Sequence, residues 1–380
     1  MFGKQEPTTA TSENKGFSFS GTAKEYFGIW IVNLLLSIVT IGIYTAWAKV
    51  RRLRYFYGNT WLDGHNFEYH AKPKQILIGR IIVFGVLLLV QIISTVFPLF
   101  ALFVLIPYLL AFPWLLNKAI SFNARMTSYR NVHFNFEGSY GAAFMTFVLL
   151  PLIVPIIATV LIGLGFYSGS ISPFDRTLLG IIVALYFVAQ LAIIPFISKK
   201  TNEYIGNRTR YGAARFATEM ELSALYKNLG ILVLCAGVPI VVIAGIAYFA
   251  IQSGASSLAL GSGQFIIFII YAVLIGGAVF YAAGVRNIAY NGTTLDGVHK
   301  FHSTVSRLGY TIIIITNFLA IIVSLGLLRP WTAVRTWRYL TDHTTMQVSG
   351  SMDGFIAGQE EAGSVIAGEY LDIEGIDFGL

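Results

Sequence analysis

The chain contains eight apolar runs, each close to the length at which a helix crosses a lipid bilayer, about 20 residues. Of its 380 residues, 56% are hydrophobic and 12% are charged, whereas a soluble domain typically carries about 25% charged residues. Because so much apolar surface would associate in water, the sequence predicts an all-α polytopic membrane protein with six to eight membrane helices. The runs are Tyr26–Ala48, Ile76–Ile93, Leu99–Leu116, Ala142–Gly165, Leu178–Ile197, Leu229–Ala250, Phe265–Gly284 and Tyr310–Leu328.

The first and last runs lie in segments that resemble each other. Residues 17–67 and 301–339 align when one is shifted by 284 positions, and an apolar run in each ends in a tryptophan followed by arginines. In this alignment Gly42 corresponds to Gly326. The sequence therefore predicts an internal repeat at the two ends of the membrane region.

Lysine and arginine are concentrated in four connections between the runs. The segments 49–74, 118–139, 199–228 and 286–307 hold 18 of the 26 basic residues. By the positive-inside rule, these connections are expected to be cytoplasmic. The net charge of +7 is then a sign of membrane topology, and we expect no nucleic-acid partner.

The same connections share a pattern that predicts four short cytoplasmic β-hairpins. In each, a threonine is followed seven residues later by a phenylalanine, with turn-forming residues such as Asp63-Gly64 between them. Asp-Gly between alternating apolar residues favours a tight hairpin turn. Because an isolated hairpin is marginal in water, these would gain by joining into a small sheet. The threonines are Thr60, Thr127, Thr209 and Thr294, and the phenylalanines are Phe67, Phe134, Phe216 and Phe301.

The two end runs allow two topologies. If all eight runs cross, both termini are external, and Lys24 and the arginines after the last run lie on the wrong side. Alternatively, the first and last runs enter the membrane and return, breaking near Asn33 and Gly42 and near Asn317 and Gly326. Phe17-Ser18-Phe19 also resembles the second strand of a connecting hairpin, which favours a cytoplasmic start for the first run.

Polar segments flank the membrane region. We expect a disordered polar N-terminus at residues 1–16, a membrane domain at 17–340 and an acidic C-terminal tail at 341–380. Residues 342–377 contain eight acidic residues and no lysine or arginine. Such a tail is usually solvated, and a protein partner that binds it is the alternative.

Several residues of the first segment resemble the YjgN-like family of bacterial inner-membrane proteins, whose function is unknown. The residues are Phe17-x-Phe19-x-Gly21-Thr22, Tyr26-Phe27, Gly42-Ile43-Tyr44-x-x-Trp47-Ala48, Arg51 to Tyr55, Asn59, Gly64 and Phe67. Ala46 departs from the proline expected there, which the second copy has as Pro330. The resemblance implies a multi-pass protein of the bacterial inner membrane and supplies no activity, substrate or catalytic residue.

Few polar residues lie deep within the apolar runs, and none of them is a carboxylate. Asn33 and Asn317 correspond in the repeat and are the candidates for a shared polar membrane site. Their alternative role is hydrogen bonding between helices, worth about 1 kcal/mol or less per contact.

A second group of candidates lies where the end runs meet arginines. Tryptophan is typical of the membrane interface, and basic residues there attract anionic lipid headgroups. Topological retention on the cytoplasmic side also accounts for the arginines. The candidates are Trp47, Arg51, Arg54, Trp331, Arg335 and Arg338.

No residue pattern points to catalysis, a cofactor or a metal. The pairs His65 with His70 and His299 with His302 lack the spacing of a zinc-binding helix and are expected to be exposed loop histidines. Cys235 is the only cysteine. We therefore expect no enzyme and weigh two roles: a transporter or channel for a small solute, and a membrane scaffold or adaptor that binds partners through its hairpins and acidic tail.

Overall fold

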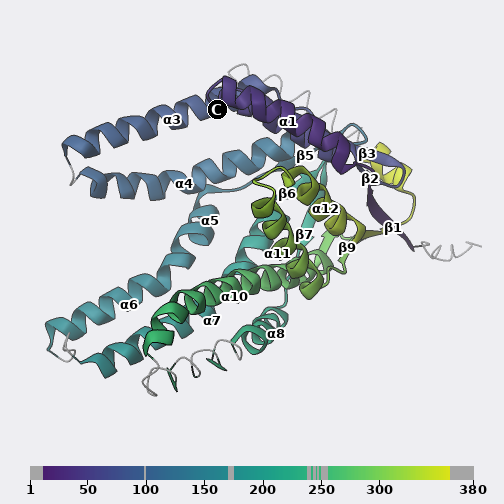
Figure 1. Ribbon diagram of the computed structural model, residues 1–380. Helices are drawn as coiled ribbons and strands as arrows, with labels where there is room; N and C mark the ends of the chain where they lie inside the picture. Colours follow the sequence, from purple (N-terminus) through teal and green to yellow (C-terminus); the bar gives the residue numbers. More distant parts are fainter. Residues whose placement is uncertain are drawn as a thin grey trace, which may run out of the picture.

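Ten short strands lie at one end of a set of long helices in the computed structural model (Figure 1). The structure describes residues 12–97, 100–169, 175–237, 241–242, 245, 248–249 and 256–359. The strands are β1 (Ser12–Phe19), β2 (Thr60–Leu62), β3 (His65–Tyr69), β4 (Thr127–Tyr129), β5 (Val132–Phe136), β6 (Thr209–Tyr211), β7 (Ala214–Thr218), β8 (Thr293–Leu295), β9 (His299–Ser303) and β10 (Thr344–Ser349).

Helices fill the intervals between successive hairpins. Two π-helical segments, Met145–Leu149 and Val233–Gly237, continue α5 and α8, and a short helix at residues 352–359 follows β10. The α-helices are α1 (Ala23–Val39), α2 (Thr45–Gly58), α3 (Pro73–Val96), α4 (Phe100–Arg125), α5 (Tyr140–Phe144), α6 (Leu150–Tyr167), α7 (Arg176–Asn207), α8 (Leu222–Leu232), α10 (Ser256–Asn291), α11 (Arg307–Val323) and α12 (Arg329–Asp342).

The ten strands close into an antiparallel barrel. Strands neighbouring in sequence pair from β2 to β10, and β1 pairs with both β2 and β10. In the closing pair, Ser12 lies opposite Ser349 and Gly16 opposite Thr345. Because a closed barrel has no free edge, every short strand has a partner on both sides.

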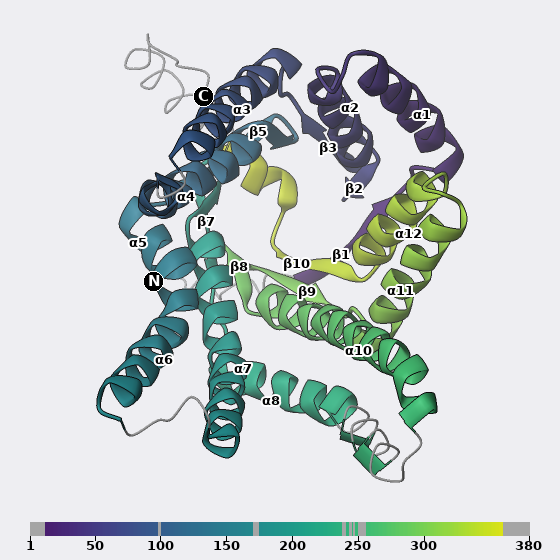
Figure 2. The ribbon, with the colours of Figure 1, turned by 60° about the vertical axis from the view of Figure 1, so that its left-hand side comes forward.

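The chain builds this barrel from five similar units. In each unit a strand leads into helices that run out from the barrel and back, and the returning helix leads into the next strand. Figure 2 shows the resulting helical segments distributed around the central strands. The units are β1–α1–α2–β2, β3–α3–α4–β4, β5–α5–α6–α7–β6, β7–α8–α10–β8 and β9–α11–α12–β10.

A threonine marks each change from returning helix to strand. Its hydroxyl donates to the carbonyl oxygen four residues earlier, a group left free at a helix C-terminus. The bonds are Thr60 to Phe56 (2.8 Å), Thr127 to Asn123 (2.8 Å), Thr209 to Ile205 (2.7 Å), Thr293 to Ala289 (2.7 Å) and Thr344 to Leu340 (2.6 Å). In the fourth hairpin the equivalent residue is thus Thr293 and not Thr294, since its turn is one residue longer than expected.

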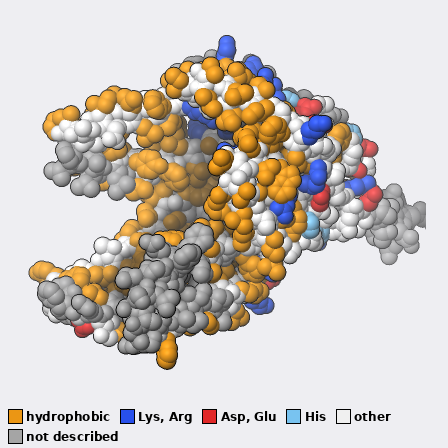
Figure 3. All heavy atoms as spheres, viewed as in Figure 1, with side chains coloured by type: hydrophobic (Ala, Val, Ile, Leu, Met, Phe, Trp, Pro, Cys, Tyr) orange, Lys and Arg blue, Asp and Glu red, His pale blue; other side chains and the backbone are white. Residues whose placement is uncertain are grey.

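The long helices carry apolar side chains on their exposed surfaces. Phe84 in α3 is 67% exposed and Leu161 in α6 is 61% exposed. Figure 3 shows hydrophobic side chains over much of the described surface of the two projecting arms, while most visible charged side chains gather toward the barrel. Within the described residues, four helices are long and apolar enough to cross a membrane: Pro73–Val96, Tyr140–Tyr167, Thr177–Asn207 and Tyr271–Asn291.

The first and last apolar runs each fold into two shorter helices that turn back. Gly42 (φ 88°) and Gly326 (φ 91°) occupy the turns in a left-handed conformation that glycine tolerates. At the base of the first hairpin, the Thr22 amide donates to the Tyr55 hydroxyl over 2.7 Å. The Ser306 amide donates to the Tyr339 hydroxyl in the last (3.2 Å). Both hairpins therefore begin and end at the barrel, as in the second of the two topologies considered.

The expected fold class is wrong. The protein is not all-α, because its connecting hairpins and two terminal strands form a closed ten-stranded barrel. Four described helices meet the criteria for spanning, fewer than the six to eight expected. The four predicted hairpins exist, as β2–β3, β4–β5, β6–β7 and β8–β9.

The folded region extends past both expected boundaries of the membrane domain. Strand β1 starts at Ser12, within the segment expected to be disordered. Strand β10 and the helix at 352–359 lie within the segment expected to be an acidic tail. The remainder of that tail, 360–380, lies outside the described residues.

Closure of the barrel predicts a specific crosslink. In a chain with Cys235→Ser, the substitutions Asn14→Cys and Gln347→Cys introduce cysteines at paired positions of β1 and β10. Mild oxidation is expected to join them, because facing residues of antiparallel strands lie within disulfide reach. The product is measured as a shift in gel mobility that reduction reverses.

The matched control pairs Asn14→Cys with Lys300→Cys. Lys300 lies on β9, one strand beyond β10, opposite Gln347. Efficient crosslinking of this pair, without crosslinking of residues 14 and 347, would contradict the closing register.

Candidate functional site

The interior of the barrel contains a band of five phenylalanines, one from each unit. Each lies on the strand that enters the helices, opposite a large residue on the next strand. Successive ring centroids along the chain are separated by 6.1, 6.4, 6.3 and 5.8 Å. The facing pairs are Phe17 with Leu62, Phe67 with Tyr129, Phe134 with Tyr211, Phe216 with Leu295 and Phe301 with Met346.

Two tyrosines that face phenylalanines of this band form hydrogen bonds between neighbouring units. The Tyr129 hydroxyl donates to the Leu62 carbonyl oxygen over 2.7 Å, and the Tyr211 hydroxyl donates to the Tyr129 carbonyl oxygen over 3.0 Å. Burial raises the pKa of Tyr129 to about 12. It therefore stays a neutral donor at physiological pH, and the wall of the barrel keeps this bond.

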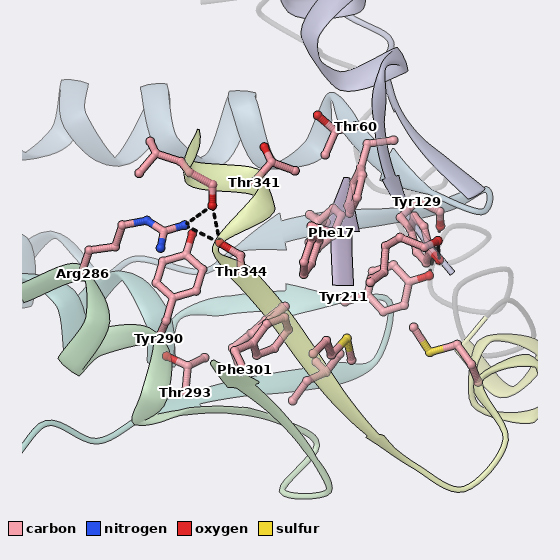
Figure 4. A pocket seen from close by; sticks show the side chains of 18 of the residues that line it. Phe17, Thr60, Tyr129, Tyr211, Arg286, Tyr290, Thr293, Phe301, Thr341 and Thr344 are labelled. Carbon is pink, nitrogen blue, oxygen red and sulfur yellow. Dashed lines mark hydrogen bonds between the residues drawn. The ribbon is translucent and has the colours of Figure 1, made fainter. Parts of the chain in front are cut away.

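These side chains surround a cavity of about 510 Å³, which we call the lumen. Its wall is mainly aromatic and aliphatic, and its volume falls within the range of small-molecule sites, about 300–1,000 Å³. Figure 4 shows Phe17, Tyr129, Tyr211 and Phe301 around it. The lumen can therefore accept an apolar group.

The short helix at 352–359 closes the turn end of the lumen. Met352 and Phe355 line the cavity, and Ile356 is 2% exposed. Asp353 forms an ion pair with Arg130 at 2.7 Å. The Gln359 side chain accepts hydrogen bonds from two backbone amides in the β6–β7 hairpin, at 2.9 and 2.8 Å. This helix is thus held by both apolar and polar contacts.

The opposite end of the lumen, its mouth, is formed by residues of α10 and α12 and is more polar. Arg286 donates to the hydroxyls of Ser303 and Thr344, the latter over 2.8 Å. Its guanidinium carbon lies 4.1 Å from the centroid of the Tyr290 ring. Trp337 Nε1 donates to the Thr60 hydroxyl over 2.9 Å. Among the described lining residues, Arg286 is the only charged one.

The match to a known protein family covers nearly the full length of the chain. Residues 14–373 match the family described as "Bacterial protein of unknown function (DUF898)". The chain belongs to this family.

Similar curated proteins carry the name "Inner membrane protein YjgN". That of Salmonella typhimurium is 26% identical over 381 residues, covering 92% of each chain. That of Escherichia coli O157:H7 is 27% identical over 241 residues, covering 61% of this chain and 59% of its own. No solved structure matches. The predicted family resemblance is confirmed, and together with the apolar helices it places this DUF898 protein in the bacterial inner membrane.

The two asparagines chosen from the sequence lie in separate helical hairpins of this DUF898 protein. Asn33 and Asn317 are 6% and 5% exposed. The Asn317 amide donates to the Thr336 hydroxyl (2.8 Å), and its oxygen accepts from Arg335 (3.1 Å). Asn33 Oδ1 has no partner among the described residues. Neither asparagine lines the lumen.

The arginines predicted to meet lipid headgroups divide into two kinds. Arg54 donates to the carbonyl oxygens of Tyr69 and Ala71, at 3.1 and 3.2 Å. Arg338 donates to the Gly21 carbonyl oxygen over 2.7 Å. Arg54 therefore joins α2 to the second unit, and Arg338 joins α12 to the first unit, its neighbour around the ring.

The other headgroup candidates contact aromatic rings or line a groove. Arg51 lies 5.8 Å from the ring centroid of Tyr44, which also stacks on Trp47 at 5.9 Å. Arg335 lies 5.1 Å from the Trp331 ring. Trp331, Arg335 and Arg338 line a second cavity of about 490 Å³ beside α1, α11 and α12. Headgroup binding by these residues stays a prediction.

Sequence reasoning missed the lumen and its arginine. The sequence signal that could have revealed the lumen is the recurrence of threonine and phenylalanine in every connection. This recurrence also extends to Phe17 and Thr344 in the terminal strands. Within the described residues, no group of three or more His, Cys, Asp or Glu side chains could hold a metal.

His299 is buried, contrary to the exposed position expected from the sequence. It is 2% exposed, and its ring centroid lies 4.5 Å from that of Phe355 in the closing helix. Nδ1 accepts the Ser349 backbone N–H over 3.3 Å. Burial lowers the pKa of His299, which the charge of Asp296 partly offsets.

Acidification is therefore expected to weaken the closure of the lumen. A histidine with a depressed folded pKa contributes stability above its ordinary pKa of 6.5. That contribution is lost as the pH falls through 6.5 toward the folded value, because the unfolded or opened state then binds more protons. Protease cleavage near residues 352–359 should become faster at pH 5.5 than at pH 7.5.

His299→Gln is the informative variant, because it removes the titrating group at this position. Its cleavage rate should depend less on pH than that of the wild type. His65→Gln, which changes an exposed histidine on β3, is the control and should keep the wild-type pH response. An equal pH response in His299→Gln would exclude this histidine as the cause.

Proposed function

We propose that this inner-membrane protein is a carrier for a small amphipathic solute, which enters the lumen from the membrane side. The observation that carries the proposal is the apolar cavity of about 510 Å³ with a polar mouth at its helix end. Ligand sites are typically concave, mainly apolar and provided with a few polar groups. The lumen has all three properties.

The position of the lumen supports a route from the bilayer. All five units converge on the barrel, and residues of α10 and α12 form the mouth. Tyr271–Asn291, the apolar part of α10, is long enough to span the membrane and contains the lining residues Arg286 and Tyr290. A solute that diffuses along this helix therefore reaches the mouth without crossing the barrel wall.

The helix at 352–359 supplies the second element that a carrier needs, a closure on the opposite side. Arg130–Asp353 is a single ion pair whose carboxylate partner lies at the surface, with side chains 20% and 80% exposed, and surface pairs are worth about 1 kcal/mol or less. Opening at this end therefore requires few polar contacts to break, although Ile356 and Phe355 must leave an apolar environment.

We also infer that the two end hairpins are copies of one ancestral unit. Gly42 and Gly326 occupy equivalent turns, and Tyr55 and Tyr339 close equivalent hairpin bases. Membrane carriers often place their sites between such repeats. Here the repeated hairpins flank β1 and β10, where the barrel closes.

Photolabelling tests the site. A diazirine-bearing hexadecanol, bound to the protein in phosphatidylcholine nanodiscs, should label residues of the phenylalanine band. Leu295→Trp places a larger side chain in the lumen, where Leu295 is 4% exposed, and should abolish this labelling. Leu308→Trp is the control, because Leu308 is 63% exposed on α11. Labelling confined to the outer helices, unaffected by Leu295→Trp, would refute the lumen as the site.

Transport and partner binding are separated by two further measurements. Proteoliposomes should accelerate transbilayer movement of a fluorescent lysophosphatidylcholine, followed by dithionite quenching, and Leu295→Trp should return the rate to the protein-free value. An adaptor would instead give the same quenching rate as protein-free liposomes. It would also copurify with other proteins, which would be lost when residues 360–380 are deleted.

A further inference from the structure

We propose that the ligand of the lumen is an anionic amphiphile, a single alkyl chain with one carboxylate or phosphate group, and that Arg286 binds its charge. This inference rests on the proposed carrier function and specifies the substrate class. It follows from the contrast between one cation at the mouth and the apolar wall beyond it.

The five units provide five equivalent positions, and only one of them carries a charge. Each position lies seven residues before the threonine that ends the returning helix. The fold therefore does not require an arginine here, since four units form without one. The residues at the five positions are Leu53, Ile120, Asn202, Arg286 and Trp337.

All contacts that the structure gives the Arg286 guanidinium are with neutral groups. Its acceptors are the hydroxyls of Ser303 and Thr344 and the Leu340 carbonyl oxygen, the last at 3.5 Å. It also packs on the Tyr290 ring. Among the described residues, no carboxylate lies within ion-pair distance of it. A partly buried cation without a counterion is costly, so an anion in the mouth would be favourable.

The hydrogen bonds fix the guanidinium and leave donors available. An arginine has five N–H groups in a planar fork, and the three contacts to Ser303, Leu340 and Thr344 occupy at most three of them. These bonds use one N–H of Nη1 and both N–H groups of Nη2, which leaves Nε–H and the second Nη1–H as two separate donors. A hydrogen bond from either of them to a charged carboxylate or phosphate is stronger than one to a neutral hydroxyl. Arg286 is therefore a held donor whose remaining capacity matches an oxyanion.

The space next to Arg286 suits an alkyl chain. The lumen continues from Arg286 and Thr344 to Phe301 and Met346, and it ends at Phe355. Figure 4 shows Arg286 at one side of the cavity and the aromatic side chains beyond it. The apolar wall can replace the lipid tails that surround an alkyl chain in the bilayer, so the chain can move from lipid into the lumen without entering water. A ligand with its anionic group at Arg286 and its alkyl chain along the phenylalanine band therefore matches both the polar mouth and the apolar wall of the lumen.

Competition with the photoreactive hexadecanol tests the headgroup. Unlabelled hexadecanol, hexadecanoate and hexadecyl phosphate are compared in phosphatidylcholine nanodiscs at pH 7.5. In the wild type, at least one anion should displace the label at a concentration about tenfold or more below that of hexadecanol, since hydrogen bonds to a charged group are worth about 1.5–3 kcal/mol. The more effective anion distinguishes a carboxylate ligand from a phosphate ligand.

Arg286→Gln should remove the preference for anions, so that hexadecanoate and hexadecyl phosphate displace the label no better than hexadecanol does. Arg286→Lys keeps the charge and should retain part of the preference. Lys300→Gln is the matched control, because Lys300 is an exposed cation on β9 beside Phe301, and it should behave as the wild type.

The outcomes separate this inference from the proposed function. Equal displacement by alcohol and anions in the wild type, or an unchanged preference in Arg286→Gln, overturns the role of Arg286 while the lumen remains a site for alkyl chains. Absence of lumen labelling by the photoreactive alcohol overturns both. The wild-type comparison decides the matter even where Arg286→Gln does not fold.

Discussion

Backbone hydrogen bonding around a closed ring is the interaction on which this structure depends. Strands of three to eight residues have too few contacts to persist singly, and an isolated hairpin is marginal. Pairing of β1 with β10 gives each strand two neighbours. The ring then fixes the bases of the helical segments, so the long helices can extend apart with apolar side chains exposed to lipid.

Local patterns predicted the hairpins but not their assembly. The turn at Asp63-Gly64 and the threonine–phenylalanine spacing depend on neighbouring residues, and the sequence shows both. The pairing of β3 with β4 joins residues separated by a membrane hairpin, and no local pattern records it. The same limit hid β10, whose residues Thr344–Ser349 lie in a segment read as tail. The first run seemed long enough to span because Gly42 interrupts it without changing its hydropathy.

The candidate site was missed for a related reason. Asn33 and Asn317 are polar residues in apolar runs, yet both are buried and neither lines the lumen. Arg286 was counted among the basic residues of a connection, which explains its charge by topology alone. Its special position appears only when the five units are compared at the same distance before the threonine of each returning helix, and the barrel defines these units.

Closure of the ring by the first and last strands sets an order for biogenesis. Strand β1 leaves the ribosome before α1, while its partner β10 follows α11 and α12. Strand β1 therefore has at least one open edge until β10 is made. A chain interrupted before Thr344 keeps that edge exposed and lacks the residues that cover the lumen. Synthesis of β10 and of the helix at 352–359 is thus the step that closes the barrel and covers the lumen.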